Sequence, residues 1–191
     1  NWDERVPIHA ASRFYDVDGF KAGKSTLVSI ELDEMDDVSG KSLLHLQCHF
    51  GMDTMSWARM GANVTGVDFS EAAIDLARSL SDEIDIPARF VASNIYDLPE
   101  ALDEAGQFDV VYTSYGVLGW LPDMAGWARV VTHFLKPGGT FYIVDGHPAK
   151  NIFDHEGDGG LRVRHPSFGS GEPKKAAPAR LPARALPPPH F

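Results

Sequence analysis

The sequence is poor in cysteine and in basic residues, and it has no long apolar run. Cys48 is the single cysteine among 191 residues, so no disulfide bond can form within the chain. No segment has the apolar length of a membrane span or the layout of a signal peptide, and we therefore expect a cytoplasmic protein without a membrane partner. Lys and Arg number 17 against 27 Asp and Glu, which gives a formal net charge of -10. A chain this acidic has no overall positive field to gather nucleic acid, so a nucleic-acid partner is not expected.

Apolar residues are plentiful enough for one globular domain. They make up 43% of the chain, which at this length excludes a disordered or fibrous protein. The chain opens with Asn1 and not with Met, so we expect residues upstream of it. Residues 1–40 mix charged with aromatic side chains, and we interpret them as an N-terminal helical or irregular segment that is either a lid or simple packing. Its aromatic residues include Trp2, Phe14, Tyr15 and Phe20.

Between residues 41 and 148, short β-rich runs alternate with helical patterns. Gly61 ends the first helical pattern, Ser70 is the expected N-cap of the second, and Asp123 opens the helix before the turn at 136–139. Strands separated by helices predict an α/β fold: a doubly wound, Rossmann-like and mostly parallel sheet with a ligand crevice at the carboxyl ends of its strands. The five predicted strands are Leu43–Leu46, Asn63–Val67, Arg89–Val91, Phe108–Thr113 and Thr140–Val144.

The last part of the chain, residues 149–191, breaks this rhythm. Asn151–Gly171 is rich in glycine and histidine, and Glu172–Phe191 is rich in proline, alanine and arginine. Such a composition cannot bury a core, so we expect a loop followed by a disordered tail. We also find no β-rich segment after Val144.

Gly51 and Asp68 occupy the two positions that a doubly wound nucleotide site requires. The turn after the first strand must let the backbone approach the ligand, and an acid that closes the second strand accepts hydrogen bonds from ribose hydroxyls. The interval from Gln47 to Asp68 is close to the roughly 20 residues expected between such a loop and its acid. Each residue also has a purely structural interpretation, Gly51 as an ordinary helix-entry glycine and Asp68 as a cap of the following helix.

Four motifs in sequence order extend this pattern to a known family. They are LLHLQCHFG at residues 43–51, VTGVDFS at 64–70, FDVVYT at 108–113 and LKPGGTF at 135–141. With these motifs, the part of the chain from about residue 41 to residue 148 resembles the class I S-adenosylmethionine-dependent methyltransferases. Within them it is similar to a bacterial branch that carries HLQCHFG where most members have an acid and a glycine-rich loop.

The resemblance implies S-adenosylmethionine as the cofactor and assigns its contacts. The loop from Gln47 to Gly51 would face the methionine part, and Asp68 would bind the ribose. The residues after the third strand would contact the adenine, and those after the fourth would line the floor near the reactive methyl group. Two departures from the family stand out: His45 replaces the usual acid, and Gln47 and His49 replace two glycines, which shrinks backbone freedom. The implied cofactor-binding residues are Gln47, His49, Gly51, Asp68, Phe69, Asn94, Ile95, Ser114 and Tyr115.

The resemblance also implies a C-terminal hairpin, because class I methyltransferases normally end with two antiparallel strands on the sheet edge. Since no β-rich run follows Val144, we expect the sheet to lack this hairpin. Two hypotheses follow: an active methyltransferase that modifies an O, N or C centre of a small molecule, or a truncated or degenerate cofactor-binding core without transferase activity. The sequence identifies no catalytic residue, methyl acceptor or oligomeric state.

Other ligands are less consistent with the sequence. A nicotinamide or flavin dinucleotide needs the pattern G-x-G-x-x-G to admit its pyrophosphate, and that pattern is absent. His45, Cys48 and His49 are possible zinc ligands, but a fourth ligand at motif spacing is missing, so no metal is expected. Without an activating partner nearby in sequence, Cys48 is interpreted as a small buried hydrophobe.

Acceptor-side residues remain open at this point. His147, which follows the fifth strand, is the first candidate for a general base because an imidazole titrates near neutral pH. His9 and Tyr115 are weaker candidates. Trp120 either lines an acceptor pocket or packs in a loop, whereas the helical spacing of Trp127 places it in the core.

Overall fold

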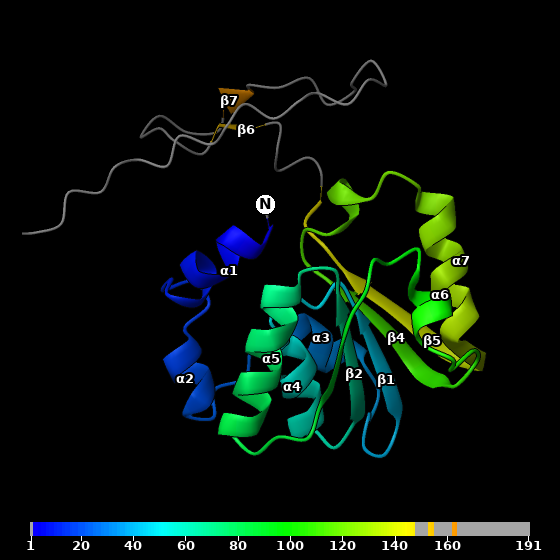
Figure 1. The fold of residues 1–191 in the computed structure, drawn as a ribbon, viewed down its shortest axis with the longest axis horizontal. Helices are drawn as coiled ribbons and strands as arrows, with labels where there is room; N and C mark the ends of the chain where they lie inside the picture. Colours follow the sequence, from blue (N-terminus) through cyan, green and yellow to red (C-terminus); the bar gives the residue numbers. More distant parts are fainter. Residues whose placement is uncertain (1, 148–152, 155–161, 164–191) are drawn as a thin grey trace, which may run out of the picture. The chain divides into compact units, whose positions relative to one another are not determined.

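A computed structural model describes residues 2–147, 153–154 and 162–163. The chain divides into two compact units, Asn1–Gly146 and His147–Phe191. The first unit holds a five-stranded sheet with the strand order β3-β2-β1-β4-β5, in which every neighbouring pair is parallel (Figure 1). The prediction of a doubly wound α/β sheet is therefore confirmed. The strands are β1 (Ser42–Leu46), β2 (Asn63–Asp68), β3 (Arg89–Ala92), β4 (Phe108–Ser114) and β5 (Leu135–Val144).

Helices fill the connections between the strands and precede the first of them. Ser70 caps the helix after β2 by accepting a hydrogen bond from the Ala73 N–H at 3.2 Å, and Asp123 caps the helix before β5 by accepting one from the Gly126 N–H at 2.8 Å. Both helix starts match the sequence prediction. The helices are α1 (Trp2–Ala10), α2 (Val17–Lys21), α3 (Ser29–Glu34), α4 (Met52–Arg59), α5 (Glu71–Glu83), α6 (Leu98–Ala101) and α7 (Met124–Phe134), with a 3₁₀ turn η1 (Leu118–Trp120).

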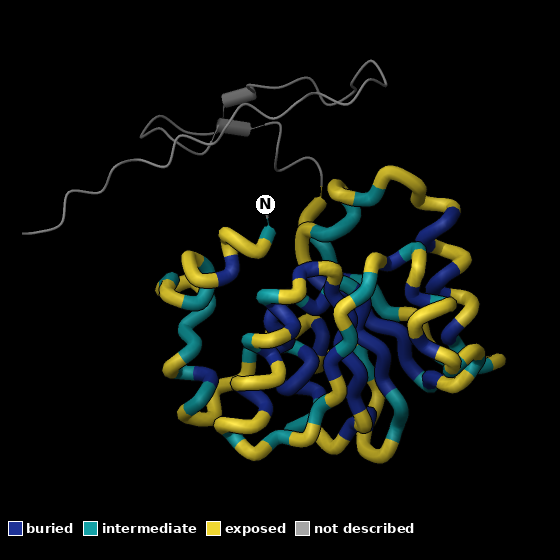
Figure 2. The backbone as a smooth tube through the Cα atoms, in the orientation of Figure 1, coloured by how far each residue is buried: buried dark blue, intermediate teal, exposed yellow. Residues whose placement is uncertain are grey.

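Alternate side chains of the central strands pack on opposite faces of the sheet. Leu43 lies in a buried cluster with Trp57 of α4, whereas Leu44 and Leu46 lie in another cluster with Trp127 of α7. This period of two is expected for a parallel strand that is covered on both faces. Figure 2 shows the result, with buried backbone concentrated in the centre of the sheet.

The fifth strand begins earlier than the sequence predicted. Phe108 already pairs with Leu135, and Val110 pairs with Thr140, so residues 136–139 lie opposite Asp109 alone. Gly138 in this stretch has a φ of 79°, a conformation that glycine adopts without steric cost. The predicted turn is thus a bulge inside β5, because sheet pairing resumes on both sides of it.

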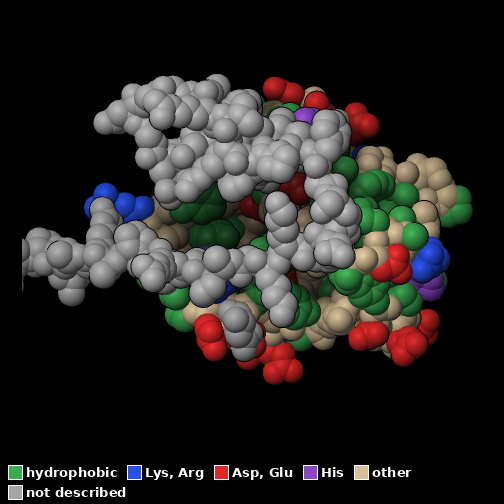
Figure 3. Space-filling view, turned by 90° about the horizontal axis from the view of Figure 1, so that it is seen from above, with side chains coloured by type: hydrophobic (Ala, Val, Ile, Leu, Met, Phe, Trp, Pro, Cys, Tyr) green, Lys and Arg blue, Asp and Glu red, His purple; other side chains and the backbone are tan. Residues whose placement is uncertain are grey.

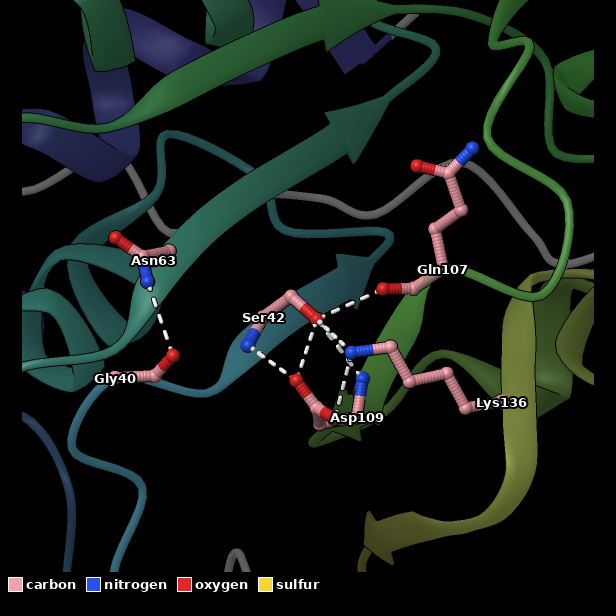
Figure 4. Close-up of polar contacts among 6 residues, drawn as sticks. All are labelled: Gly40, Ser42, Asn63, Gln107, Asp109 and Lys136. Atoms are coloured by element: carbon pink, nitrogen blue, oxygen red, sulfur yellow. Dashed lines mark hydrogen bonds and ion pairs between the residues drawn. The ribbon is translucent and has the colours of Figure 1, made fainter.

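Asp109 explains how the bulge is held. Its carboxylate accepts hydrogen bonds from the Ser42 N–H at 2.9 Å and the Ser42 hydroxyl at 2.7 Å, and it pairs with Lys136 Nζ at 2.7 Å (Figure 4). Lys136 and these hydrogen bonds hold the pKa of Asp109 well below its usual range. The contacts join β1, β4 and β5 near their amino ends, at the edge opposite the predicted crevice.

The second unit contains two short strands, β6 (Phe153–Asp154) and β7 (Arg162–Val163), which pair antiparallel in a sheet of their own. The five-stranded sheet has no antiparallel strand among the described residues, as predicted. The sequence shows no β-rich segment after Val144, and the two-residue strands β6 and β7 are too short to leave such a pattern. The predicted disordered tail, Glu172–Phe191, lies outside the described residues. None of the described helices combines the length and apolar character that a membrane crossing needs.

Candidate functional site

A cavity of about 690 Å³ opens at the carboxyl ends of the strands, within the size range of small-molecule sites. Its walls come from the loops after β1, β2, β3 and β4 and from the N-terminal segment. Figure 3 views this end of the molecule, where hydrophobic and acidic side chains gather in the part left in view. The residues that the resemblance assigned to cofactor binding all line it: Gln47, His49, Gly51, Asp68, Phe69, Asn94, Ile95, Ser114 and Tyr115.

The strand order arranges these residues in a row. Asn94 and Ile95 follow β3, Asp68 closes β2, the loop 47–51 follows β1, and Ser114 closes β4. Because the sheet order is β3-β2-β1-β4, positions far apart in sequence become neighbours along one edge. An elongated ligand lying across this edge would meet them in that order.

The loop after β1 has an unusual backbone. Gln47 and His49 have φ angles of 60° and 52°, in the left-handed region that costs a non-glycine residue roughly 1–2 kcal/mol. The structure thus places large side chains in the conformation that the family's glycines would adopt freely. Gly51 has a φ of 74°, and a Cβ there would clash with the Phe90 ring. Packing therefore requires glycine at the start of α4, independently of any ligand.

Asp68 anchors this loop to β2. One carboxylate oxygen accepts a hydrogen bond from the His49 N–H at 2.8 Å, and the other accepts one from the Ser70 N–H at 3.0 Å. Burial raises the pKa of Asp68, while these hydrogen bonds oppose the shift. The Phe69 N–H is a third backbone donor to this carboxylate, and because a carboxylate accepts about four hydrogen bonds, capacity for a further donor remains. The Ser70 side chain caps α5, so Asp68 is not needed for that role. Its carboxylate can therefore hold the loop after β1 and bind a ligand as well.

His45 cannot act as a substitute for the missing acid. Its ring is buried, with Nδ1 2.8 Å from the Thr54 hydroxyl and Nε2 3.2 Å from the Ser114 hydroxyl. Burial lowers the pKa of His45 to about 3, so the imidazole is neutral at pH 7. The Ser114 hydroxyl donates its proton to Asp53 at 3.0 Å, so it can only accept a hydrogen bond from His45. The imidazole proton of His45 is therefore assigned to Nε2.

Asp53 lines the cavity, although the sequence analysis did not single it out. It lies in the first turn of α4, two residues after Gly51, and burial raises its pKa. An acid at the start of a helix usually complements the helix dipole, so its sequence position alone gave no sign of a ligand role.

The N-terminal segment packs against the loop through aromatic rings. His9 Nδ1 lies 3.1 Å from His49 Nε2, and the Tyr15 ring stacks on the His49 ring with centroids 5.4 Å apart. Trp2 meets Trp120 edge-on at 5.3 Å. Burial lowers the pKa of His9 and takes that of His49 to about 4, so both rings are neutral at pH 7. The sequence is compatible with either a lid or simple packing for this segment; in the structure the segment supplies part of the cavity wall.

The other candidates take different positions. Trp120 is 61% exposed and lines the cavity, whereas Trp127 is buried in the core, as predicted. Cys48 is buried, and burial raises the pKa of its thiol, which disfavours the thiolate. No cluster of three or more potential metal ligands is found in the part of the chain that the structure describes. His147 begins the second unit, so its assignment as a base stays a prediction.

A doubly wound sheet with a cavity across its carboxyl edge and a carboxylate closing β2 defines a nucleotide-binding α/β domain. The sequence matches the methyltransferase domain family over residues 44–141. The chain belongs to this family, and its fold is that of the class I S-adenosylmethionine-dependent methyltransferases.

Individual relatives agree with this assignment. The chain is 32% identical over 124 residues to the ubiquinone biosynthesis O-methyltransferase of Marinobacter nauticus, covering 64% of this chain and 52% of the relative. It is 30% identical over 136 residues to the enzyme of the same name from Xanthomonas oryzae, covering 70% and 56%. An S-adenosylmethionine-dependent methyltransferase structure from Mesorhizobium loti superposes with a TM-score of 0.57 at 26% identity, covering 71% of this chain and 63% of that one. The chain spans about half the length of the curated relatives it matches.

Proposed function

We propose that the chain transfers a methyl group from S-adenosylmethionine to a small-molecule acceptor. The observation that carries this proposal is the Asp68 carboxylate, which closes β2 inside the cavity and retains acceptor capacity beyond its backbone hydrogen bonds. A ribose diol offers two hydroxyl donors to such a group. Family membership and the row of residues along the carboxyl edge support the same cofactor.

The residues present fit this cofactor. Gln47 Oε1 and His49 Nδ1 are buried without a hydrogen-bond partner in the structure, and both residues line the cavity. Buried polar atoms without partners are costly in a protein interior. A bound polar ligand would supply the missing hydrogen bonds.

In this proposal the side chains bind and align, while the sulfonium supplies an activated methyl group when the cofactor is bound. Asp68 holds the ribose, Asn94 and Ile95 contact the adenine, and Ser114 and Tyr115 border the methyl group. The buried cavity floor excludes water from the reacting atoms. Alignment and desolvation are the main contributions a protein makes to such a displacement.

Exposed aromatic side chains support an acceptor with a flat apolar portion. Phe14, Phe69, Tyr115 and Trp120 are each at least 47% exposed and all line the cavity. Aromatic rings in a ligand stack favourably on such side chains. Because the relatives are named as O-methyltransferases of ubiquinone biosynthesis, O-methylation is the first reaction to test.

The acidic chain disfavours a nucleic-acid acceptor, and its one buried cysteine is consistent with the cytoplasmic location that we propose.

Isothermal titration calorimetry with S-adenosylhomocysteine, the demethylated cofactor, tests the binding part of the proposal. We expect saturable binding to the wild-type chain and a tenfold to hundredfold weaker affinity for Asp68→Ala, since a charge-assisted acceptor contributes about 1.5–3 kcal/mol. Asp75→Ala, which removes an exposed carboxylate on α5, is the control and should bind as the wild type does. Unchanged affinity in Asp68→Ala would refute the ribose assignment.

Turnover decides between an active enzyme and a degenerate core. With S-adenosylmethionine and a panel of phenols, an active enzyme forms methylated product, and saturated cyclic alcohols of the same size react less because they cannot stack and because they ionise far less readily than phenols. Cofactor binding without product from any phenol, alcohol or amine would favour the degenerate core.

A further inference from the structure

Asp53 brings a carboxylate into the cavity. The resemblance expects an acid at position 45 on β1, but His45 is neutral, buried and hydrogen bonded through both ring nitrogens. Strand β1 therefore contributes no negative charge. Asp53 reaches the same Ser114 hydroxyl that His45 contacts, but from α4.

The position of Asp53 along the sheet edge identifies the part of the ligand it faces. Ser114, its hydrogen-bond partner, closes β4, which lies on the far side of β1 from Asp68 and β2. With the adenine at β3 and the ribose at β2, the remaining part of the cofactor extends over β1 toward β4. That part is the methionine moiety, which carries an ammonium group.

Within residues 2–147, Asp53 lacks a positively charged partner. No Lys or Arg forms an ion pair with it among the residues that the structure describes, and its hydrogen-bond partners there are hydroxyl groups. A partly buried carboxylate without a cation is costly unless a ligand provides one. Gln47 Oε1, a second acceptor lining the same cavity, is buried and has no hydrogen-bond partner in the described part of the chain. An ammonium group has three N–H donors and would satisfy both.

We propose that Asp53 binds the α-ammonium group of the cofactor's methionine moiety. This proposal rests on the proposed function, because it requires an adenosylmethionine-type ligand in the cavity. In it, Ser114 orients the Asp53 carboxylate, and His45 orients Ser114. Gln47 shares the ammonium group with Asp53.

Two ligands that differ in the amino-acid part test the proposal by calorimetry. S-adenosylhomocysteine carries the ammonium group, whereas 5′-methylthioadenosine keeps the nucleoside and lacks the amino acid. For Asp53→Asn we expect tenfold to hundredfold weaker binding of S-adenosylhomocysteine and a change of less than about twofold for 5′-methylthioadenosine. Asp109→Asn is the matched control: it also removes a carboxylate that accepts from a serine hydroxyl, but at the opposite edge of the sheet, and should leave both affinities unchanged.

The outcomes separate the two proposals. If the wild type binds neither ligand, the proposed function fails and the role of Asp53 fails with it. If the wild type binds S-adenosylhomocysteine and Asp53→Asn binds it equally well, or weakens both ligands alike, the role of Asp53 alone is overturned. If circular dichroism shows that Asp53→Asn does not fold, the affinity of the wild type for a second ligand replaces the variant. That ligand is the S-adenosyl derivative of 4-mercaptobutyric acid, which differs from S-adenosylhomocysteine only in lacking the ammonium group. Equal affinity for that compound and S-adenosylhomocysteine would overturn the proposal.

Discussion

At the scale of single residues, the sequence was informative where the backbone imposes a requirement. Gly51 and Asp68 could be located because a strand, a turn and a helix in sequence order fix where such residues stand, and both line the cavity. Asp53 could not be located, because an acid in a first helical turn has a common structural explanation. The hydrogen bond that gives it significance joins it to Ser114, which is distant in sequence. Contacts of this kind appear only when the chain is folded.

Gly51→Ala is predicted to destabilise the fold by about 2–5 kcal/mol. The left-handed backbone costs alanine roughly 1–2 kcal/mol, and the contact of the added Cβ with the Phe90 ring adds an overpacking cost of roughly 1–3 kcal/mol. Gly40→Ala isolates the first contribution, because Gly40 has a φ of 73° and no atom within 4 Å of the added carbon. Chemical denaturation measures both variants. Equal losses of unfolding free energy in the two variants would show that the Phe90 ring moves aside without lowering the stability of the fold.

At the scale of elements, prediction succeeded for helix starts and failed where tertiary pairing decides. Ser70 was predicted as an N-cap, and Pro122 and Asp123 as the start of a helix; in the structure Ser70 and Asp123 both accept backbone hydrogen bonds as N-caps. The start of β5 was misplaced, because residues 136–139 have the composition of a turn while the partner strand β4 extends the pairing back to Leu135. Local chemistry determines a cap, whereas a strand boundary also depends on its neighbour.

Two aspartates at helix starts provide a matched test of capping. Asp123 accepts a hydrogen bond from the Gly126 N–H at 2.8 Å, whereas Asp97, at the same position of α6, makes no such bond. We expect Asp123→Ala to lower the unfolding free energy by about 1 kcal/mol and Asp97→Ala to change it by less than about 0.5 kcal/mol. Urea denaturation of the two variants measures the difference. Similar values would mean that the hydrogen bond on α7 contributes nothing beyond helix-dipole compensation.

At the scale of the whole molecule, the alternation of strands and helices was sufficient to predict the parallel sheet and the edge where the cavity forms. Strand order and the closing of the cavity by the N-terminal segment were beyond the sequence pattern. Trp2, Tyr15 and His9 approach the site through rings packed on His49 and Trp120. Aromatic residues in an N-terminal segment are equally compatible with core packing, so the pattern left both possibilities open.

The Asp109 network should make the whole fold sensitive to acid. Lys136 and Ser42 hold the folded pKa of Asp109 well below its usual range, so in the acid range the unfolded state binds more protons at this residue, and stability rises with pH. This contribution is complete above the unfolded pKa of about 4 and is lost as the pH falls from there toward the lower, folded pKa.

We expect Asp109→Asn to lower the melting temperature at pH 7 and to flatten its decline between pH 4 and pH 2. Because the Asp109 and Lys136 side chains are 34% and 41% exposed, solvent screening keeps the effect small, and differential scanning calorimetry at low salt is the suitable measurement. If the melting temperature of Asp109→Asn falls as steeply as that of the wild type in this range, ionisation of Asp109 does not contribute to the acid sensitivity of the fold.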